Sequence, residues 1–200
     1  MSSSENTILG LKMATDPRWV DIASLSIEDI LCDHAFCEQK AASQCITIIQ
    51  QYPEYSAVVE ALAPIVTEEW GHFRMVLAEM KKRGYKLAAQ RKDEYVIQLV
   101  KRLPKSGSNE YRLMHKLLFC ALIEARSCER FRLLSEGIAD ESLKEFYYKF
   151  MVSEAGHYRL FLDLANQYYD ADTVRTEWLK WLAIEKEILA QIPVRADRMH

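Results

Sequence analysis

Two copies of one short motif, Glu69-x-Gly-His72 and Glu154-x-Gly-His157, stand far apart in the sequence. Each copy continues with an arginine and a leucine at the same spacing, so five residue types recur in register. On a helix, residues three apart lie on one face, and the glutamate and histidine of each copy can therefore bind the same ion. Carboxylate oxygens combined with imidazole nitrogens suit iron or manganese better than zinc or copper. The repeat predicts a metal site with two matched halves.

Two further glutamates precede the motifs at nearly equal distances, Glu38 before Glu69 and Glu124 before Glu154. If the two halves of the chain are equivalent, each of these glutamates faces one Glu-x-x-His pair from a neighbouring helix. Glu124 shares a helical stripe with apolar residues, which directs it toward the core. Glu129 is the alternative, but its own stripe contains charged residues and is expected to be solvated. Glu124 is therefore preferred.

Helices are predicted along almost the whole chain, because glycine and proline are sparse and apolar residues recur every three to four positions. Ser26 with Asp29 resembles a capping box, Asp140 is a candidate N-cap, and Pro64 is expected to kink or restart a long helix. No strand is expected. The expected helices cover approximately residues 16–25, 26–52, 54–83, 91–103, 109–136, 140–169 and 173–190.

The order of these helices predicts an all-α fold of the ferritin-like class, which is a four-helix bundle with one long connection. Two antiparallel pairs of long helices are joined by a crossover helix at residues 91–103, and short helices are added near the termini. Each Glu-x-x-His motif then lies on the second helix of its pair, with its partner glutamate on the first. We expect residues 1–200 to form one domain, with flexible tails at residues 1–15 and 192–200.

Four buried carboxylates without counter-ions would repel one another, and each would lose its hydration. Two divalent ions neutralise four glutamates, so the expected site is dinuclear. A single Glu-x-x-His on a helix is usually a surface pair, but two matched copies with matched partners favour metal binding. The residues predicted to be both metal ligands and catalytic residues are Glu38, Glu69, His72, Glu124, Glu154 and His157.

Other side chains near the motifs carry weaker signals. His34 lies one turn before Glu38. It is expected either to hydrogen-bond this ligand or to pack in the core, and the first alternative is preferred. Arginines near the motifs, among them Arg126, are assigned no chemistry, because a helical arginine is more often solvated over a buried stem.

The composition argues against several other classes of protein. The net charge of −3 and the pI near 6.0 give no overall attraction to nucleic acid or membrane. The stretch "MSSSENT" has neither the basic nor the apolar region of a signal peptide, and the longest apolar run, residues 117–123, is too short to span a bilayer, so a cytoplasmic location is expected. Five cysteines without a CxxC pair are expected to be reduced. The sequence contains no phosphate-binding loop, nucleophile elbow, flavin motif or Fe–S motif.

Several stretches of the sequence resemble the MiaE family of tRNA hydroxylases, and together they cover most of residues 15–165. These stretches are "TDPRWVDIA", "DHAFCEQKAAS", "EEWGHF", "KRGYKLAAQRKDEYV", "ALIEARSCERFRLLSE" and "SEAGHYRLFLDLA". The resemblance implies a non-haem di-iron monooxygenase that hydroxylates the isopentenyl group of 2-methylthio-N6-isopentenyladenosine, next to the anticodon of tRNA. It implies two iron ions (Fe2+/Fe3+) at the six predicted ligands, O2 as co-substrate, and no bound flavin or haem. A separate electron donor of the ferredoxin or reductase type is then required.

A tRNA substrate carries phosphates that bind to basic side chains, and one segment of the sequence is rich in such residues. Between residues 81 and 105, nine lysines and arginines stand against only Asp93 and Glu94. Such a segment can face phosphates, but cations are also favoured at the C-terminus of a helix and in exposed loops. The candidate tRNA-binding residues are Lys81, Lys82, Arg83, Lys86, Arg91, Lys92, Lys101, Arg102 and Lys105.

Three alternative functions remain open from the sequence. The same six ligands can serve a di-iron hydroxylase of a small lipid or quinone, which is expected to show an apolar helix facing a membrane. A ferritin-like or rubrerythrin-like iron or peroxide protein is the second alternative, although the CxxC module of rubrerythrin is missing. A metal-free helical interaction module is the third, and it predicts that the six residues can be changed to alanine without loss of bound iron.

Overall fold

Seven helices make up the part of the chain that the computed structural model describes, residues 7–199. Residues 1–6 and 200, which belong to the expected tails, lie outside the described part. No strand occurs within residues 7–199, in agreement with the predicted all-α class. The helices are α1 (Trp19–Ser24), α2 (Ile27–Gln51), α3 (Ser56–Lys82), α4 (Glu94–Val100), α5 (Asn109–Gly137), α6 (Glu141–Tyr168) and α7 (Ala171–Leu189).

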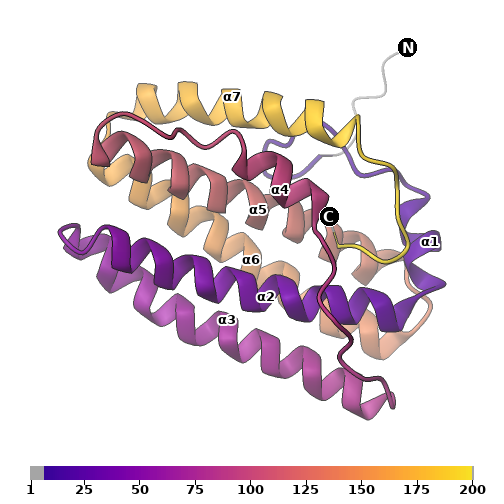
Figure 1. The fold of residues 1–200 in the computed structure, drawn as a ribbon. Coiled ribbons are helices and arrows are strands. Elements are labelled where there is room, and N and C mark those ends of the chain that lie inside the picture. The colour runs from indigo at the N-terminus through magenta and orange to yellow at the C-terminus, as the bar shows by residue number, and fades with distance from the viewer. Residues whose placement is uncertain (1–6, 200) are drawn as a thin grey trace. The chain divides into compact units, whose positions relative to one another are not determined.

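Contacts between residues divide the described chain into two compact units. The α2–α3 unit contains residues 22–92 and 195–199, and the α5–α6 unit contains residues 7–21 and 93–194. Each unit holds one pair of long antiparallel helices joined by a short loop (Figure 1). Each also carries one copy of the repeated motif, on α3 and on α6. A single domain over the whole chain stays a prediction.

The α2–α3 unit is a helical hairpin that buries the apolar face of each helix. Helix α2 ends at Gln51, because Pro53 follows and disfavours helical geometry in the residue before it. Helix α3 ends at Lys82, and Gly84 follows with a φ of 76°, a left-handed value that glycine adopts at little cost. The buried apolar residues of the two helices include Ile30, Leu31, Ile48, Val58, Leu62, Val76 and Met80.

One local prediction in this unit, the cap at Ser26, is wrong. The Ser26 side chain makes no cap hydrogen bond at the start of α2, and its backbone angles (φ −138°, ψ 52°) lie outside the extended geometry of a regular cap. Helix α3 is continuous through Pro64, so the expected restart does not occur, while a kink at Pro64 stays a prediction. Pro64 and Glu60, whose carbonyl loses its helical donor, are both exposed, so water can satisfy this carbonyl.

Side-chain caps determine where helices of the α5–α6 unit begin. Asp140 Oδ1 accepts hydrogen bonds from the backbone N–H groups of Ser142 and Leu143, at 2.9 and 3.1 Å, which confirms the predicted cap of α6. Asp93 Oδ1 accepts a hydrogen bond from the backbone N–H of Val96 at 3.1 Å. Helix α4 therefore begins later than expected and is shorter than the crossover helix predicted from the sequence.

Aromatic side chains fill the core between α5 and α6. Phe131 stacks on Tyr147 with ring centroids 5.8 Å apart, and it contacts Phe150 at 5.5 Å. Helix α7 packs beside α5, where the buried indole of Trp181 donates a hydrogen bond to Nδ1 of His115 at 3.1 Å. These contacts hold the register of α5 and α6, the helices that carry one half of the predicted metal site. No helix within residues 7–199 has the length and apolar character needed to cross a membrane.

The described parts of both expected tails make specific contacts within their own units. In the α5–α6 unit, the Tyr158 hydroxyl donates a hydrogen bond to the carbonyl of Leu9 at 3.3 Å. In the α2–α3 unit, the backbone N–H of Met199 donates to Asp33 Oδ2 at 2.9 Å. Both contacts join residues more than a hundred positions apart, so no local sequence pattern indicates them.

The two glycines of the repeated motif, Gly71 and Gly156, lie inside helices, where glycine lowers stability. A Cβ atom at either position would meet no atom within 4 Å. Replacement by alanine is therefore expected to raise the free energy of unfolding by about 0.5–1 kcal/mol at each site. Urea denaturation of Gly71→Ala and Gly156→Ala measures this change. Gly84→Ala is the control and should destabilise, because the φ of Gly84 is 76°; a loss of stability in the two helical variants would contradict the prediction.

Candidate metal centre

In the α2–α3 unit, Glu38 on α2 meets Glu69 and His72 on α3. Nδ1 of His72 lies 3.3 Å from Glu69 Oε2 and 3.4 Å from Glu38 Oε2. One ligand atom from each residue lies within 4.8 Å of the other two. The two glutamates are 4% and 1% exposed and the histidine is 8% exposed. The structure thus brings three of the six predicted ligands together in a buried half-site.

His34 lies one turn before Glu38 on α2 and contacts the same carboxylate. Its Nε2 is 2.7 Å from Glu38 Oε1, and the residue is fully buried. Oε1 of Glu38 therefore faces His34, while Oε2 faces His72. Both sequence alternatives for His34 describe part of its role, since it is a core residue that also holds one oxygen of a predicted ligand.

The Glu38 carboxyl of this half-site favours its protonated form. Burial raises the pKa of the Glu38 carboxyl to about 8; the hydrogen bond with His72 opposes this rise, and the charge of Glu69 adds to it. A divalent cation bound to these oxygens would supply positive charge and displace the proton. The donor set of this half-site therefore fits such an ion.

In the α5–α6 unit, Glu124 on α5 lies close to Glu154 and His157 on α6. Nδ1 of His157 is 3.0 Å from Glu154 Oε2, and one ligand atom from each of the three residues lies within 4.8 Å of the other two. All three residues are buried. This half-site has the same composition as the first, with one glutamate from the first helix of the pair and a Glu-x-x-His from the second.

Glu129, the alternative to Glu124, is not solvated as expected but is 1% exposed. Its carboxylate accepts hydrogen bonds from the hydroxyl of Thr15, at 2.7 Å, and from Arg126. The charged residues on its helical stripe indicated solvent, but the segment before α1 covers this side of α5. Glu129 is therefore engaged in an ion pair away from the half-site.

Arg126 is the centre of a buried network that local sequence patterns do not indicate. The residue is fully buried, and its Nε donates a hydrogen bond to Glu185 Oε1 on α7 at 2.8 Å. Its Nη2 donates to the carbonyl of Met13, also at 2.8 Å. Burial by itself would lower the pKa of Arg126, but the charges of Glu185 and Glu129, the nearby Tyr95 hydroxyl and the hydrogen bond with Glu185 together outweigh it, so the pKa is raised. Arg126 is therefore a cation that needs its carboxylate partners.

Arg130 joins this network from the next turn of α5. Its guanidinium lies 4.3 Å from the ring centroid of Trp19, in a cation–π contact. Burial lowers the pKa of Arg130 to about 9, and the charge of Arg126 contributes to the decrease. Two arginines thus stand beside two carboxylates, those of Glu129 and Glu185. This network is therefore balanced in charge by its own side chains.

The candidate tRNA-binding residues are distributed over both units. In the α2–α3 unit, Arg83 and Lys82 pair with Glu79, at 2.7 and 3.6 Å. Arg91 pairs with Asp29 at 2.5 Å and with Asp197 at 2.8 Å. These ion pairs reduce the charge available to phosphates. The other basic residues are exposed: Lys81, Lys86 and Lys92 in the α2–α3 unit, and Lys101, Arg102 and Lys105 in the α5–α6 unit.

Buried half-sites of glutamate and histidine on paired antiparallel helices define a protein of the ferritin-like, carboxylate-rich metal-binding class. A solved structure, described as protein 43 with aldehyde deformylating oxygenase activity from Synechococcus, supports this fold class. It matches with a TM-score of 0.90 and 33% identity, over 95% of this chain and 94% of that one. The model of the MiaE family, described as tRNA-(MS[2]IO[6]A)-hydroxylase, matches residues 3–200. The chain belongs to this family, as its sequence resemblance predicted.

Two relatives share the name tRNA 2-(methylsulfanyl)-N(6)-isopentenyladenosine(37) hydroxylase. The protein from Pseudomonas putida is 36% identical over 187 residues, which cover 93% of this chain and 89% of the relative. The protein from Salmonella typhimurium is 25% identical in an alignment that covers 86% of this chain and 79% of the relative. Both matches extend over most of the chain, so the similarity includes both helix pairs.

Proposed function

We propose that the two half-sites together hold two iron ions and that the chain is an O2-dependent tRNA monooxygenase. Its substrate is 2-methylthio-N6-isopentenyladenosine next to the anticodon, which it hydroxylates on the isopentenyl group. The observation that carries the proposal is the doubled, buried cluster of glutamate and histidine in a chain that matches the tRNA hydroxylase family over residues 3–200. The proposed ligands are Glu38, Glu69, His72, Glu124, Glu154 and His157.

The side chains of each half-site have separate tasks in this proposal. Two iron ions, when bound, supply the activation of O2 that hydroxylation of an alkyl carbon requires. The four glutamates neutralise two divalent cations, and the two histidines complete the donor set. His34 holds Oε1 of Glu38 and so directs Oε2 away from it, in the way that residues behind a metal ligand orient it. Burial of the ligands excludes bulk water from the reacting atoms.

The partners follow from the balance of the reaction. Hydroxylation places one oxygen atom of O2 in the product and reduces the other to water, which consumes two electrons and two protons. We propose that a separate ferredoxin-type or reductase-type donor supplies the electrons. The exposed cations between residues 81 and 105 are proposed to contact tRNA phosphates. A tRNA substrate also supports the cytoplasmic location.

A single-turnover experiment tests this function. The protein is loaded with Fe(II) without oxygen, mixed with tRNA carrying the prenylated adenosine, and exposed to 18O2. Mass analysis of the nucleosides should show one labelled oxygen on the prenylated adenosine and none on tRNA that lacks the prenyl group. Two bound irons without label in the nucleoside would leave the metal centre in place and reject the tRNA substrate.

Oxygen-dependent deformylation of an aldehyde is the second candidate, favoured by the similarity to the Synechococcus protein. That protein is described as having aldehyde deformylating oxygenase activity, and its similarity to this chain extends over 95% of the residues. The same iron-loaded protein should be offered a long-chain aldehyde in parallel. Consumption of the aldehyde without oxygenation of the nucleoside would favour this candidate.

A further inference from the structure

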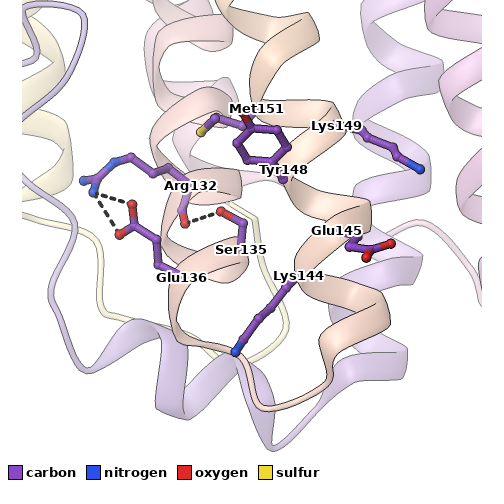
Figure 2. A pocket seen from close by; sticks show the side chains of 8 residues that line it. All are labelled: Arg132, Ser135, Glu136, Lys144, Glu145, Tyr148, Lys149 and Met151. Carbon is purple, nitrogen blue, oxygen red and sulfur yellow. Dashed lines mark hydrogen bonds and ion pairs between the residues drawn. The ribbon is translucent and has the colours of Figure 1, made fainter.

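A surface cavity of about 530 Å³ lies in the α5–α6 unit, near the loop that joins its two long helices. This volume is within the range of roughly 300–1,000 Å³ that is typical of ligand pockets. Figure 2 shows side chains from α5 and from α6 arranged around it. The lining residues are Arg132, Ser135, Glu136, Lys144, Glu145, Tyr148, Lys149 and Met151.

Three of the lining side chains are cationic, and they differ in how far their charge is already neutralised. Arg132 pairs with Glu136 at 3.1 Å, and Lys144 pairs with Glu141 at 2.6 Å. Lys149 is exposed and has no ion pair within the described residues. Its ammonium group is therefore available to an anionic ligand, and Figure 2 shows that it extends from α6 on the side opposite Arg132.

Tyr148 gives the cavity an exposed aromatic surface. Its side chain is 57% exposed, although aromatic side chains nearby on the same helix, such as Tyr147 and Phe150, are almost completely buried. Within the described part of the chain, Tyr148 makes no ring contact, whereas Tyr147 stacks on Phe131. An exposed aromatic ring next to an unpaired lysine is the combination that single-stranded nucleic acids bind, through base stacking and a phosphate contact.

The cavity is close to the half-site of the same unit. The thiol of Cys128 donates a hydrogen bond to the carbonyl of Met151, which lines the cavity, at 3.3 Å. Burial, together with the charge of Glu154, raises the pKa of Cys128 to about 12, so this thiol stays protonated. Tyr148 precedes Glu154 by less than two helical turns, which corresponds to about 9 Å along α6. A nucleotide at Tyr148 is thus within reach of the nucleotide that reacts.

We propose that this cavity binds one unstacked nucleotide of the RNA loop that carries the reactive adenosine. The base stacks on Tyr148, and the phosphate contacts Lys149. The inference rests on the proposed function, because it places a second part of the same RNA beside the metal-binding helices. It adds a contact outside the basic segment at residues 81–105.

Binding of a fluorescent anticodon stem-loop RNA with the prenylated adenosine, followed by anisotropy, tests the inference without requiring turnover. Tyr148→Ala should raise the Kd roughly tenfold or more, and Tyr148→Phe should leave it almost unchanged, because phenylalanine retains the stacking face. Lys149→Ala should weaken binding and reduce the slope of log Kd against log salt by about 0.7. Lys186→Ala, which removes an exposed lysine on α7, is the matched control and should bind like the unaltered protein.

Each outcome separates this inference from the proposed function. Equal RNA affinity in all variants, with hydroxylation by the unaltered protein, would overturn the cavity assignment alone. No RNA binding by the unaltered protein would overturn both. If Lys149→Ala kept its RNA affinity but slowed reduction by an acidic ferredoxin, the cavity would be a docking site for the electron donor and the inference would be wrong. Unchanged helicity and iron content in the variants exclude a folding defect as the cause.

Discussion

Replacement of Glu124 by glutamine is expected to remove bound iron and hydroxylase activity together. Glutamine has the size of glutamate but lacks the charge, so one half-site would lose the only carboxylate that α5 contributes to it. The loss of activity should exceed the roughly 10- to 100-fold that follows removal of a residue behind a metal ligand. Anaerobic Fe(II) titration and single-turnover assays of the variant measure both effects.

Glu129→Gln is the matched control, because Glu129 lies on the same helix and is also buried. This variant should keep its iron and lose stability, since Glu129 pairs with Arg126. The opposite pattern, with iron lost in Glu129→Gln and retained in Glu124→Gln, would show that the two glutamates have been assigned the wrong roles. Retention of iron in both variants would contradict the proposed ligand set of the α5–α6 unit.

The half-sites could be predicted from the sequence, because the spacing of their residues lies within one helix or within one pair of neighbouring helices. The Glu-x-x-His spacing places two ligands on one face of a helix whatever the rest of the fold does. To predict that Glu38 and Glu124 lie beside the two motifs, it was enough to expect that α2 pairs with α3 and α5 with α6. Short loops between long helices make this pairing the expected one. The apolar stripe of Glu124 then indicated which side of α5 is buried.

The Arg126 network could not be anticipated, because its partners come from distant parts of the chain. Glu185 lies on α7, and Thr15 and Met13 precede α1. The helical pattern places Glu129 and Arg126 on a polar side of α5. It does not indicate that other segments of the chain cover this side. The expected flexibility of residues 7–15 had the same origin. This short segment has no helical periodicity, and nothing in its sequence indicates that the Met13 carbonyl accepts a hydrogen bond from a buried arginine.

Helix boundaries were predictable where a side chain or a glycine determines them. Asp140 caps α6 through its own carboxylate, and the left-handed Gly84 follows the end of α3. Serine is common at helix N-caps, but the backbone at Ser26 does not adopt the geometry that a cap requires. The backbone angles at such a position depend on how the preceding helix packs, which the local sequence does not specify.

Arg126→Met is expected to lower the free energy of unfolding by about 3–5 kcal/mol, the usual cost of breaking a buried ion pair from one side. The substitution preserves much of the side-chain volume but leaves the carboxylates of Glu129 and Glu185 buried without their shared cation. Arg130 cannot replace it fully, because its guanidinium is placed over Trp19. Urea denaturation monitored by circular dichroism measures the change.

A triple variant distinguishes loss of charge balance from loss of packing. Arg126→Met combined with Glu129→Gln and Glu185→Gln removes the cation and both carboxylates, so it should recover a large part of the stability that Arg126→Met loses. The loss of unfolding free energy in the triple variant could instead exceed the sum of the losses in the three single variants. The hydrogen bonds to Met13 and Thr15 would then be the main contribution of Arg126 to stability. Iron binding should persist in every variant that folds. The substituted residues belong to a network that balances its own charge and contains none of the proposed metal ligands.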